Sequence, residues 1–521
     1  MSSLSAFPSP PHKGQVTLCE IQSHLVSGSA DSDVHQYTDQ VSQYPRIDLS
    51  TESLRPFVCR ENSKNAFMHH NESIAKKVFV SWQEQGVKGV LVELANNEGD
   101  GALSSCARIT AQLLLRTVQW LGSIYGSLFP HTLLSKEDLI AQFCPVLDWH
   151  HGTIRAFAWH PHTPKCAVAL RDDSVRIFAS GSRVTPLLKH KQQRGVADMA
   201  WKPYSASYLA VACQSGILLW QIEPTSLVTR PSSSCITFLQ RKGHAPVTSV
   251  AWEPDGCFLV SASAADTSIL IWDIGAESCT PMRRVGGGGV SFIRWSPDCQ
   301  RLFAATPSTL FRIWETQSWT CERWSNVIGH CQNACWSPDG SVLLFTTSEE
   351  PLIYSLHFGS TENIKPHSVA GSKSAIPVAD LTPVSVSDGS ETIRTGGRVH
   401  QMVWDGTGER LAVSFVDNPE LIAVFRTRIK PLLELSPCGF IRSPERETPQ
   451  LLSFHGSFER GALLTVCWSS GKISNIPMLF VPVKAATTNG FSSFLHSTPL
   501  YHRGIGEMPR SPFLFSSPGS L

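Results

Sequence analysis

The feature that most constrains the fold of this chain is a short segment that recurs along most of its length. Its clearest copy is PVTSVAWEPDGCFLVSASAADTSILIWDI, residues 246–274, in which Trp252-x-Pro254 is followed twenty residues later by Trp272-Asp273. Alternating apolar residues predict β-strands, and the Pro-Asp-Gly run predicts a tight turn between the first two. A single hairpin cannot bury its own apolar face, so the number of copies decides the architecture.

Six other segments repeat this plan, and their first anchors are 42, 51, 43, 41, 68 and 50 residues apart. A period near 40–45 residues with four short strands per unit is typical of a β-propeller blade. We therefore predict an all-β fold, a seven-bladed β-propeller over residues 146–483. The aromatic blade anchors include Trp159, Trp201, Trp220, Trp252, Trp295, Trp314, Trp336 and Trp404.

The long spacing between Trp336 and Trp404 indicates an insertion in blade five. Residues from about 360 to 397 are rich in Ser, Pro, Thr and Gly. This composition predicts a surface loop around the fourth strand of that blade.

The copy at 246–274 resembles the WD-repeat family most fully. In that family a His, a Ser or Thr, an Asp and the Trp form a buried hydrogen-bond network, and the matching residues here are His244, Ser261, Asp266 and Trp272. Asp266 lies six residues before Trp272, as the pattern requires, whereas Ser261 is one residue further from Asp266 than usual. The resemblance implies a structural role for these four residues rather than a catalytic one. Trp272 is expected to pack between adjacent blades.

Two segments precede the repeats. Residues 1–63 form an N-terminal extension in which GQVTLCEI (14–21) alternates like a strand. Since an unpaired sheet edge is costly, we expect 14–21 to close the last blade. Residues 64–145 show helical periodicity, and SKED predicts a helix that begins after Ser135. The Ser/Pro-rich tail, 484–521, is predicted to be disordered.

The apolar stripe over residues 102–128 is widened on a second side by Leu113, Leu115, Trp120 and Ile124. A helix that is apolar on two sides must bury both sides against other protein surfaces. It either packs between neighbouring helices and the propeller or docks onto a partner protein, and both alternatives remain open. Arg116 lies within this stretch, which favours a buried helix over a membrane span.

Composition excludes several functions. The 521 residues carry a net charge of +1, which gives no basic face for nucleic acid. The N-terminus lacks an apolar leader, so we expect the 15 cysteines to be reduced thiols in an intracellular protein. Phosphate-loop, zinc-protease and nucleophile-elbow motifs are missing. We therefore expect a protein that is not an enzyme and that needs no metal or cofactor.

Several longer segments resemble the aladin family of WD-repeat nucleoporins. That resemblance implies a peripheral component of the nuclear pore complex, held at the nuclear envelope by a membrane-embedded nucleoporin without a transmembrane span of its own. It further implies a scaffold role in nucleocytoplasmic transport and a role at the spindle pole in mitosis. The segments that carry it include GSLFPH (126–131), SKEDLIAQF (135–143), FAWHPHTPKCAVALRDDSVRIF (157–178), WKPYSASYLAVACQSGILLW (201–220), PTSLVTRPSSSC (224–235), FRIWETQSWTCERW (311–324) and CWSPDGSVLLF (335–345).

The main alternative is a substrate receptor of a ubiquitin ligase or another cytosolic adaptor. Such receptors typically end a blade with Trp-Asp-x-Arg. Here only the segment Phe425–Arg428 has the Arg, and it lacks the Asp. A propeller enzyme is disfavoured because no catalytic group stands out.

Overall fold

The computed structural model describes most of the repeat region and part of what precedes it. The chain divides into two units, Met1–Pro482 and Val483–Leu521, and the second lies outside the described residues. So does most of the segment 64–145. The described residues are 1–29, 32, 34, 37–45, 47, 49, 109–110, 112–114, 116–117 and 134–480, apart from gaps at 183, 224–227, 285, 287, 326, 359–373, 388, 390–391, 444–446 and 460.

Seven sheets of four or five strands follow one another along the chain, which confirms the predicted seven-bladed β-propeller. Each of the first four blades is an antiparallel meander. Blade one has β4 (Ile154–Trp159), β5 (Lys165–Leu170), β6 (Val175–Ala179) and β7 (Leu187–Leu188); blade two has β8 (Asp198–Trp201), β9 (Tyr208–Ala212), β10 (Ile217–Gln221) and β11 (Ile236–Leu239). Blade three has β12 (Ser249–Trp252), β13 (Leu259–Ala262), β14 (Ser268–Asp273) and β15 (Ser278–Arg283); blade four has β16 (Ile293–Trp295), β17 (Arg301–Ala305), β18 (Phe311–Glu315) and β19 (Thr320–Trp324).

The last three blades follow the same plan, and two of them gain strands from the N-terminus. Blade five has β20 (Cys331–Trp336), β21 (Val342–Thr347), β22 (Leu352–His357) and β23 (Ile376–Asp380), with β1 (Ser2–Ser3) at its outer edge. Blade six has β26 (Val399–Trp404), β27 (Arg410–Phe415), β28 (Leu421–Arg428) and β29 (Glu434–Arg442). Blade seven has β30 (Pro449–Phe454), β31 (Gly461–Trp468) and β32 (Ile473–Leu479), followed by β2 (Gln15–Ile21) and β3 (His24–Ser29).

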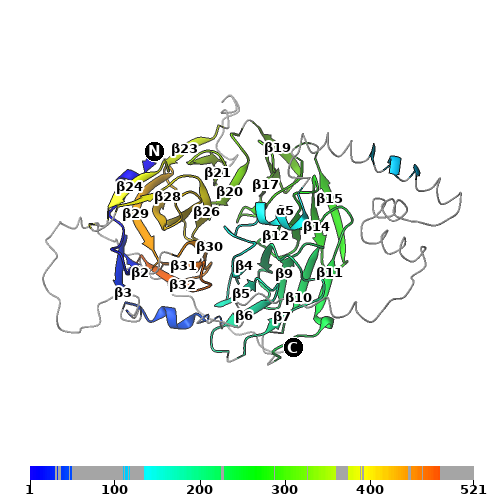
Figure 1. Ribbon diagram of the computed structural model, residues 1–521, viewed down its shortest axis with the longest axis horizontal. Helices are drawn as coiled ribbons and strands as arrows, with labels where there is room; N and C mark the ends of the chain where they lie inside the picture. The colour runs from blue at the N-terminus through cyan, green and yellow to red at the C-terminus, as the bar shows by residue number, and fades with distance from the viewer. Residues whose placement is uncertain are drawn as a thin grey trace, which may run out of the picture. The chain divides into compact units, whose positions relative to one another are not determined.

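The blades close into a ring through their innermost strands. Each of β4, β8, β12, β16, β20, β26 and β30 contacts the innermost strand of the next blade, and β30 contacts β4. Figure 1 shows the sheets in chain order around the ring, from blue-green blade one to orange blade seven. The apolar residues of the repeat fill the spaces between sheets, which explains why seven diverged copies retain the same pattern.

The segment 14–21 lies in blade seven as β2. Glu20 is paired with Met478 and Ile21 with Leu479, in parallel with β32. The C-terminal part of the repeat region supplies only three strands to this blade. The N-terminal strand β2 pairs with β32, whose backbone groups on that side would otherwise form an open sheet edge.

The insertion in blade five contains the fourth strand around which the loop over 360–397 is predicted, and also a hairpin that the prediction does not include. Its residues 359–373 lie outside the described part, but the next stretch forms β23, the fourth strand of the blade, and then the hairpin of β24 (Val384–Ser387) and β25 (Thr392–Thr395). The pairing of β23 with β22 satisfies an edge that a loop would leave open. The Ser- and Thr-rich composition concealed the strand alternation of VSVS and TIRT.

Candidate interaction surfaces and the contacts that support them

The four residues of the WD-type network lie together in blade three. His244, in the loop before β12, has Nδ1 2.9 Å from Asp266 Oδ2 and Nε2 2.9 Å from Ser261 Oγ. Trp272 donates its indole N–H to the same hydroxyl at 2.9 Å. If Nδ1 carries the proton shared with the carboxylate, Nε2 accepts from the serine hydroxyl, and every member has a partner.

The electrostatics of this network suit a structural contact. Burial raises the pKa of Asp266, but hydrogen bonds from His244 and from the Ser268 backbone outweigh it and hold that pKa below its usual value. His244, Ser261 and Trp272 are buried. The network ties the loop before blade three to the turn between its second and third strands, and only the Asp266 side chain, 22% exposed, reaches solvent.

The first anchor tryptophans join neighbouring blades through a repeated hydrogen bond. Trp201 donates its indole N–H to the carbonyl of Ala158 at 3.2 Å, and Trp252 donates to Ala200 at 3.1 Å. Trp336 donates in the same way to the carbonyl of Arg294 at 3.1 Å. Each acceptor immediately precedes the anchor of the previous blade.

The indole N–H groups of other anchor tryptophans donate to side-chain oxygens instead of the carbonyl in the previous blade. Trp159 donates to Thr465 Oγ1 of blade seven at 2.9 Å, Trp404 donates to Thr427 Oγ1 within its own blade at 3.0 Å, and Trp220 donates to Gln193 Oε1 at 3.0 Å. The indole nitrogens of Trp295 and Trp314 are buried without a hydrogen-bond partner.

The helix expected to dock onto a partner lies only partly within the described residues. Positions 109–110, 112–114 and 116–117 are helical, and Leu113 is 55% exposed. Ile109 and Leu114, in the helical stretches 109–110 and 112–114, are similarly exposed. Leu115, Trp120 and Ile124 lie outside the described part of the chain.

The N-terminal residues pack along blades five to seven, a contact that the sequence pattern did not reveal. The ring of Phe7 lies 4.9 Å from that of Phe425 and 4.8 Å from that of Phe440, in blade six. Arg442 donates to the carbonyl of Pro11 at 3.0 Å. Together with β1 and β2, these contacts make residues 1–29 an N-terminal strap over three blades.

A buried ion pair fixes the strap to blade six. Arg410, at the start of β27, donates from Nη2 to Glu20 Oε1 at 2.5 Å and from Nε to both carboxylate oxygens at 2.9 Å. The side chains are 2% and 0% exposed. Burial lowers the pKa of Arg410, but the hydrogen bonds and charge of Glu20 outweigh it and raise that pKa.

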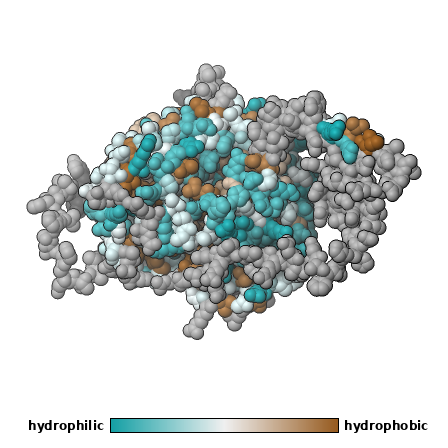
Figure 2. All heavy atoms as spheres, viewed as in Figure 1, coloured by the Kyte–Doolittle hydropathy of each residue, from teal (hydrophilic) through white to brown (hydrophobic). Residues whose placement is uncertain are grey.

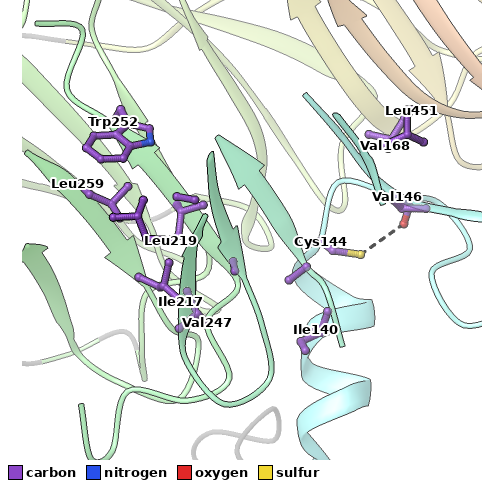
Figure 3. Packing of buried hydrophobic residues seen from close by; sticks show 14 of the residues in the cluster. Ile140, Cys144, Val146, Val168, Ile217, Leu219, Val247, Trp252, Leu259 and Leu451 are labelled. Atoms are coloured by element: carbon purple, nitrogen blue, oxygen red, sulfur yellow. Dashed lines mark hydrogen bonds between the residues drawn. The ribbon is translucent and has the colours of Figure 1, made fainter. Parts of the chain in front are cut away.

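The helix predicted after Ser135 is α5 (Lys136–Phe143). The Ser135 hydroxyl oxygen accepts from the Asp138 N–H at 3.1 Å, which caps the helix. Figure 3 shows Ile140 and Cys144 on the side of α5 that faces the apolar cluster of blades one to three, with Val146 beyond them near Val168 and Leu451. The helix and the turn after it thus belong to the core of the propeller.

The surface and the cysteines add few special features. The face in Figure 2 is mostly hydrophilic, with single hydrophobic residues scattered among polar ones. Among the described residues, the thirteen cysteines are all free and no cluster of His, Cys, Asp or Glu could hold a metal ion. No helix within the described ranges is long and apolar enough to cross a membrane.

The closed ring of seven blades and the His-Ser-Asp-Trp network define a WD-repeat β-propeller, a class of protein that presents rigid surfaces to other proteins. The model of the Aladin seven-bladed propeller family matches residues 135–479. The chain therefore belongs to the aladin family, and the resemblance found in the sequence is confirmed.

One curated relative agrees with this assignment over almost its whole length, and two further matches are more limited. The chain is 29% identical to Aladin of Arabidopsis thaliana over 496 residues, which cover 90% of this chain and 98% of that protein. A probable cytosolic Fe-S cluster assembly factor of Schizosaccharomyces japonicus is 32% identical, but over only 25% of this chain and 20% of its own length. Among solved structures, the Cps50 (Swd1) β-propeller domain of Myceliophteria thermophila matches 62% of this chain and 95% of its own, at 15% identity and a TM-score of 0.46.

Proposed function

We propose that this protein is a non-enzymatic scaffold of the nuclear pore complex that supports nucleocytoplasmic transport and has a role in assembly of the mitotic spindle. The observation that carries the proposal is the match of the aladin propeller over residues 135–479, together with similarity to a whole relative called Aladin. The protein is peripheral at the nuclear envelope, where a membrane-embedded nucleoporin holds it.

The rigid ring suits such a role because its blades hold loops and strand edges in fixed positions. Interfaces of this kind depend on shape and on a few aromatic anchors. Leu113 and Leu114 are exposed in the helical stretch 112–114 and offer apolar surface to a partner protein.

The test is the location of the full chain with a fluorescent tag in living cells. We expect a punctate nuclear rim in interphase and signal at the spindle pole in mitosis. The tag belongs at the C-terminus, because Ser2 and Ser3 pair with β23 in blade five. A uniform cytosolic signal from a folded chain would contradict the proposal.

A pull-down from nuclear-envelope extracts identifies the partners. Recovery of pore proteins supports the scaffold role at the pore. Recovery of cullin adaptors instead would favour a ubiquitin-ligase receptor, and Arg428→Ala would then be expected to abolish that recovery.

A further inference from the structure

Three arginines converge where the outer strands of blades three and four meet. Arg312 in β18 and Arg323 in β19 are directly opposite each other in an antiparallel pair. Arg284 follows the last residue of β15, the outer strand of blade three. Its guanidinium carbon lies 4.8 Å from the centre of the Trp314 ring in β18. Arg284, Arg312 and Arg323 are here called the arginine cluster.

The arginine cluster lies on the side of blade four that faces blade three. Side chains alternate between the two faces of a strand, so Arg312 shares its face of the sheet with Trp314. Arg323 shares that face with Cys321, which is paired with Trp314. Trp314 and Cys321 pack in one apolar cluster with residues of blade three, among them Met282 of β15. The guanidinium groups therefore gather between two blades, at their outer strands.

This arrangement of charges is unfavourable for the folded chain by itself. Like charges directly opposite in an antiparallel pair repel each other, and Arg312 is only 5% exposed. Arg312 Nη2 donates to the carbonyl of Gly286 at 3.1 Å, which is a neutral acceptor. Burial lowers the pKa of Arg312, the Cys321 thiol acts in the opposite direction, and the charges of Arg323 and Arg284 lower it further. A positive charge is thus held here against both burial and repulsion.

The other two members of the arginine cluster reach solvent. Arg284 and Arg323 are exposed, and no carboxylate of the described residues forms an ion pair with either. The adjacent Glu322 lies on the opposite face of β19, because successive side chains alternate. On blade six, by contrast, the exposed Arg428 is paired with Glu434 at 2.6 Å. The charges of Arg284 and Arg323 are therefore available to an anionic group from outside.

The chemistry of the arginine cluster matches a phosphate group. A planar guanidinium donates two parallel hydrogen bonds to phosphate oxygens, and a phosphate monoester has three acceptor oxygens that more than one arginine can share. The Trp314 ring beside Arg284 orients one guanidinium in advance. A nucleic acid or a membrane surface needs an extended basic stripe, whereas this site is local and the whole chain has a net charge of +1. A single phosphorylated side chain has the matching size and charge.

We propose that the arginine cluster is a docking site for a phosphorylated serine or threonine of a partner protein. The phosphate accepts hydrogen bonds from Arg284 and Arg323, and the charge of Arg312 between them and the core adds to the attraction. This inference rests on the proposed scaffold function, since it needs a partner protein. It assigns one docking surface to the outer side of blades three and four.

Urea unfolding of the full chain tests the repulsion within the arginine cluster. Arg323→Glu turns a like-charge pair with Arg312 into an opposite-charge pair, so we expect the urea midpoint to rise. Arg428→Glu is the matched control, because it turns the cross-strand pair with Glu434 into a like-charge pair and should lower the midpoint. A midpoint of Arg323→Glu at or below that of the unaltered chain would mean that the charges are already balanced, which would overturn the proposal.

The arginine side-chain signals of the full chain test the docking site directly. The chain carries nitrogen-15 arginine, and its Nε–Hε signals are assigned by Arg→Gln variants. The probe is a peptide of glycine and alanine residues with one central phosphoserine. We expect the signals of Arg284 and Arg323 to shift and saturate, and that of Arg428 to stay in place.

Variants and control peptides separate phosphate recognition from general attraction of charge. Arg284→Gln and Arg323→Gln should each weaken binding of the phosphopeptide at least ~10-fold, because each removes hydrogen bonds to a charged group. Arg428→Gln should leave the affinity unchanged. Peptides with serine or aspartate in place of phosphoserine should bind at least ~10-fold more weakly, since they lack the second charge and the third acceptor oxygen.

Four results would overturn the phosphate site: no saturable shift, an equal shift of Arg428, equal affinity for the aspartate peptide, or tighter Arg323-dependent binding of a single-stranded oligonucleotide or of phosphatidylserine vesicles. Failure of the tagged chain to reach the nuclear rim, with normal binding of the phosphopeptide, would instead overturn the proposed function and leave this inference intact.

Discussion

Replacement of Glu20 by alanine tests whether the N-terminal strap is part of the fold. The change removes the buried carboxylate that holds Arg410 and leaves a guanidinium that is 2% exposed with the half-exposed carboxylate of Glu409, at 3.6 Å, beside it. Breaking one side of a buried ion pair typically costs about 3–5 kcal/mol. The exposed pair of Arg428 and Glu434 is the matched control, since its side chains are 68% and 58% exposed and such pairs contribute about 0–1 kcal/mol.

The assay is urea unfolding of the full chain, followed by tryptophan fluorescence and by circular dichroism. We expect Glu20→Ala to lower the free energy of unfolding by several kcal/mol and Glu434→Ala to change it by less than about 1 kcal/mol. A double variant, Glu20→Leu with Arg410→Met, fills the same space without charge and should recover most of the loss. If Glu20→Ala were as mild as Glu434→Ala, the buried ion pair would not contribute to the attachment of the strap to blade six.

Three further predictions concern single buried positions. Ser261→Ala leaves an indole N–H and an imidazole nitrogen unpaired and should cost about 1–3 kcal/mol for each, measured by urea unfolding. Burial lowers the pKa of His400 to about 4, below its unfolded value near 6.5, so its contribution to stability is complete above pH 6.5 and is lost as the pH falls toward 4. This loss amounts to about 3 kcal/mol, and His400→Gln should flatten the pH dependence of unfolding over that range. Gly289→Ala should prevent folding or reduce soluble yield sharply, since φ is +144° and a Cβ would lie 1.9 Å from the Ala264 carbonyl oxygen. Gly275→Ala is the control and should be far milder, because its φ lies outside the left-handed region and its Cβ would have Asp273 Oδ1 as nearest neighbour, at 3.4 Å.

The sequence predicts the features of this fold that depend on local pattern. The spacing of Trp-x-Pro and of the second anchors gives the number of blades, because each blade must bury the same face. The places of His244 and Asp266 relative to Trp272 follow from the repeat as well. Even the irregular spacing of Ser261 is tolerated, since its hydroxyl still lies 2.9 Å from both His244 and Trp272.

Features that depend on distant partners could not be predicted in this way. Glu20 and Arg410 are 390 residues apart, and neither lies in a distinctive motif. The hairpin of β24 and β25 is short and rich in Ser and Thr, so its alternation is weak. A small cavity beside the end of α5 is lined by residues from five blades, and no linear pattern reports on such a convergence.

The closed ring has one seam at which adjacent blades are not consecutive in sequence, between blades seven and one. Side-chain hydrogen bonds cross it: Trp159 donates to Thr465 Oγ1 at 2.9 Å, and the Ser457 hydroxyl donates to the carbonyl of Pro161 at 2.7 Å. The N-terminal strap reinforces blades five to seven on the outside, whereas Tyr44 packs at this seam, its ring 5.9 Å from that of Trp159 and 4.9 Å from that of His455. In an open repeat array the end units fray first, whereas a closed ring has no end until a seam opens. A lesion at Trp159 would therefore expose the apolar faces of two blades at once, and its effect on partner binding would arise from loss of the ring rather than from loss of a contact surface.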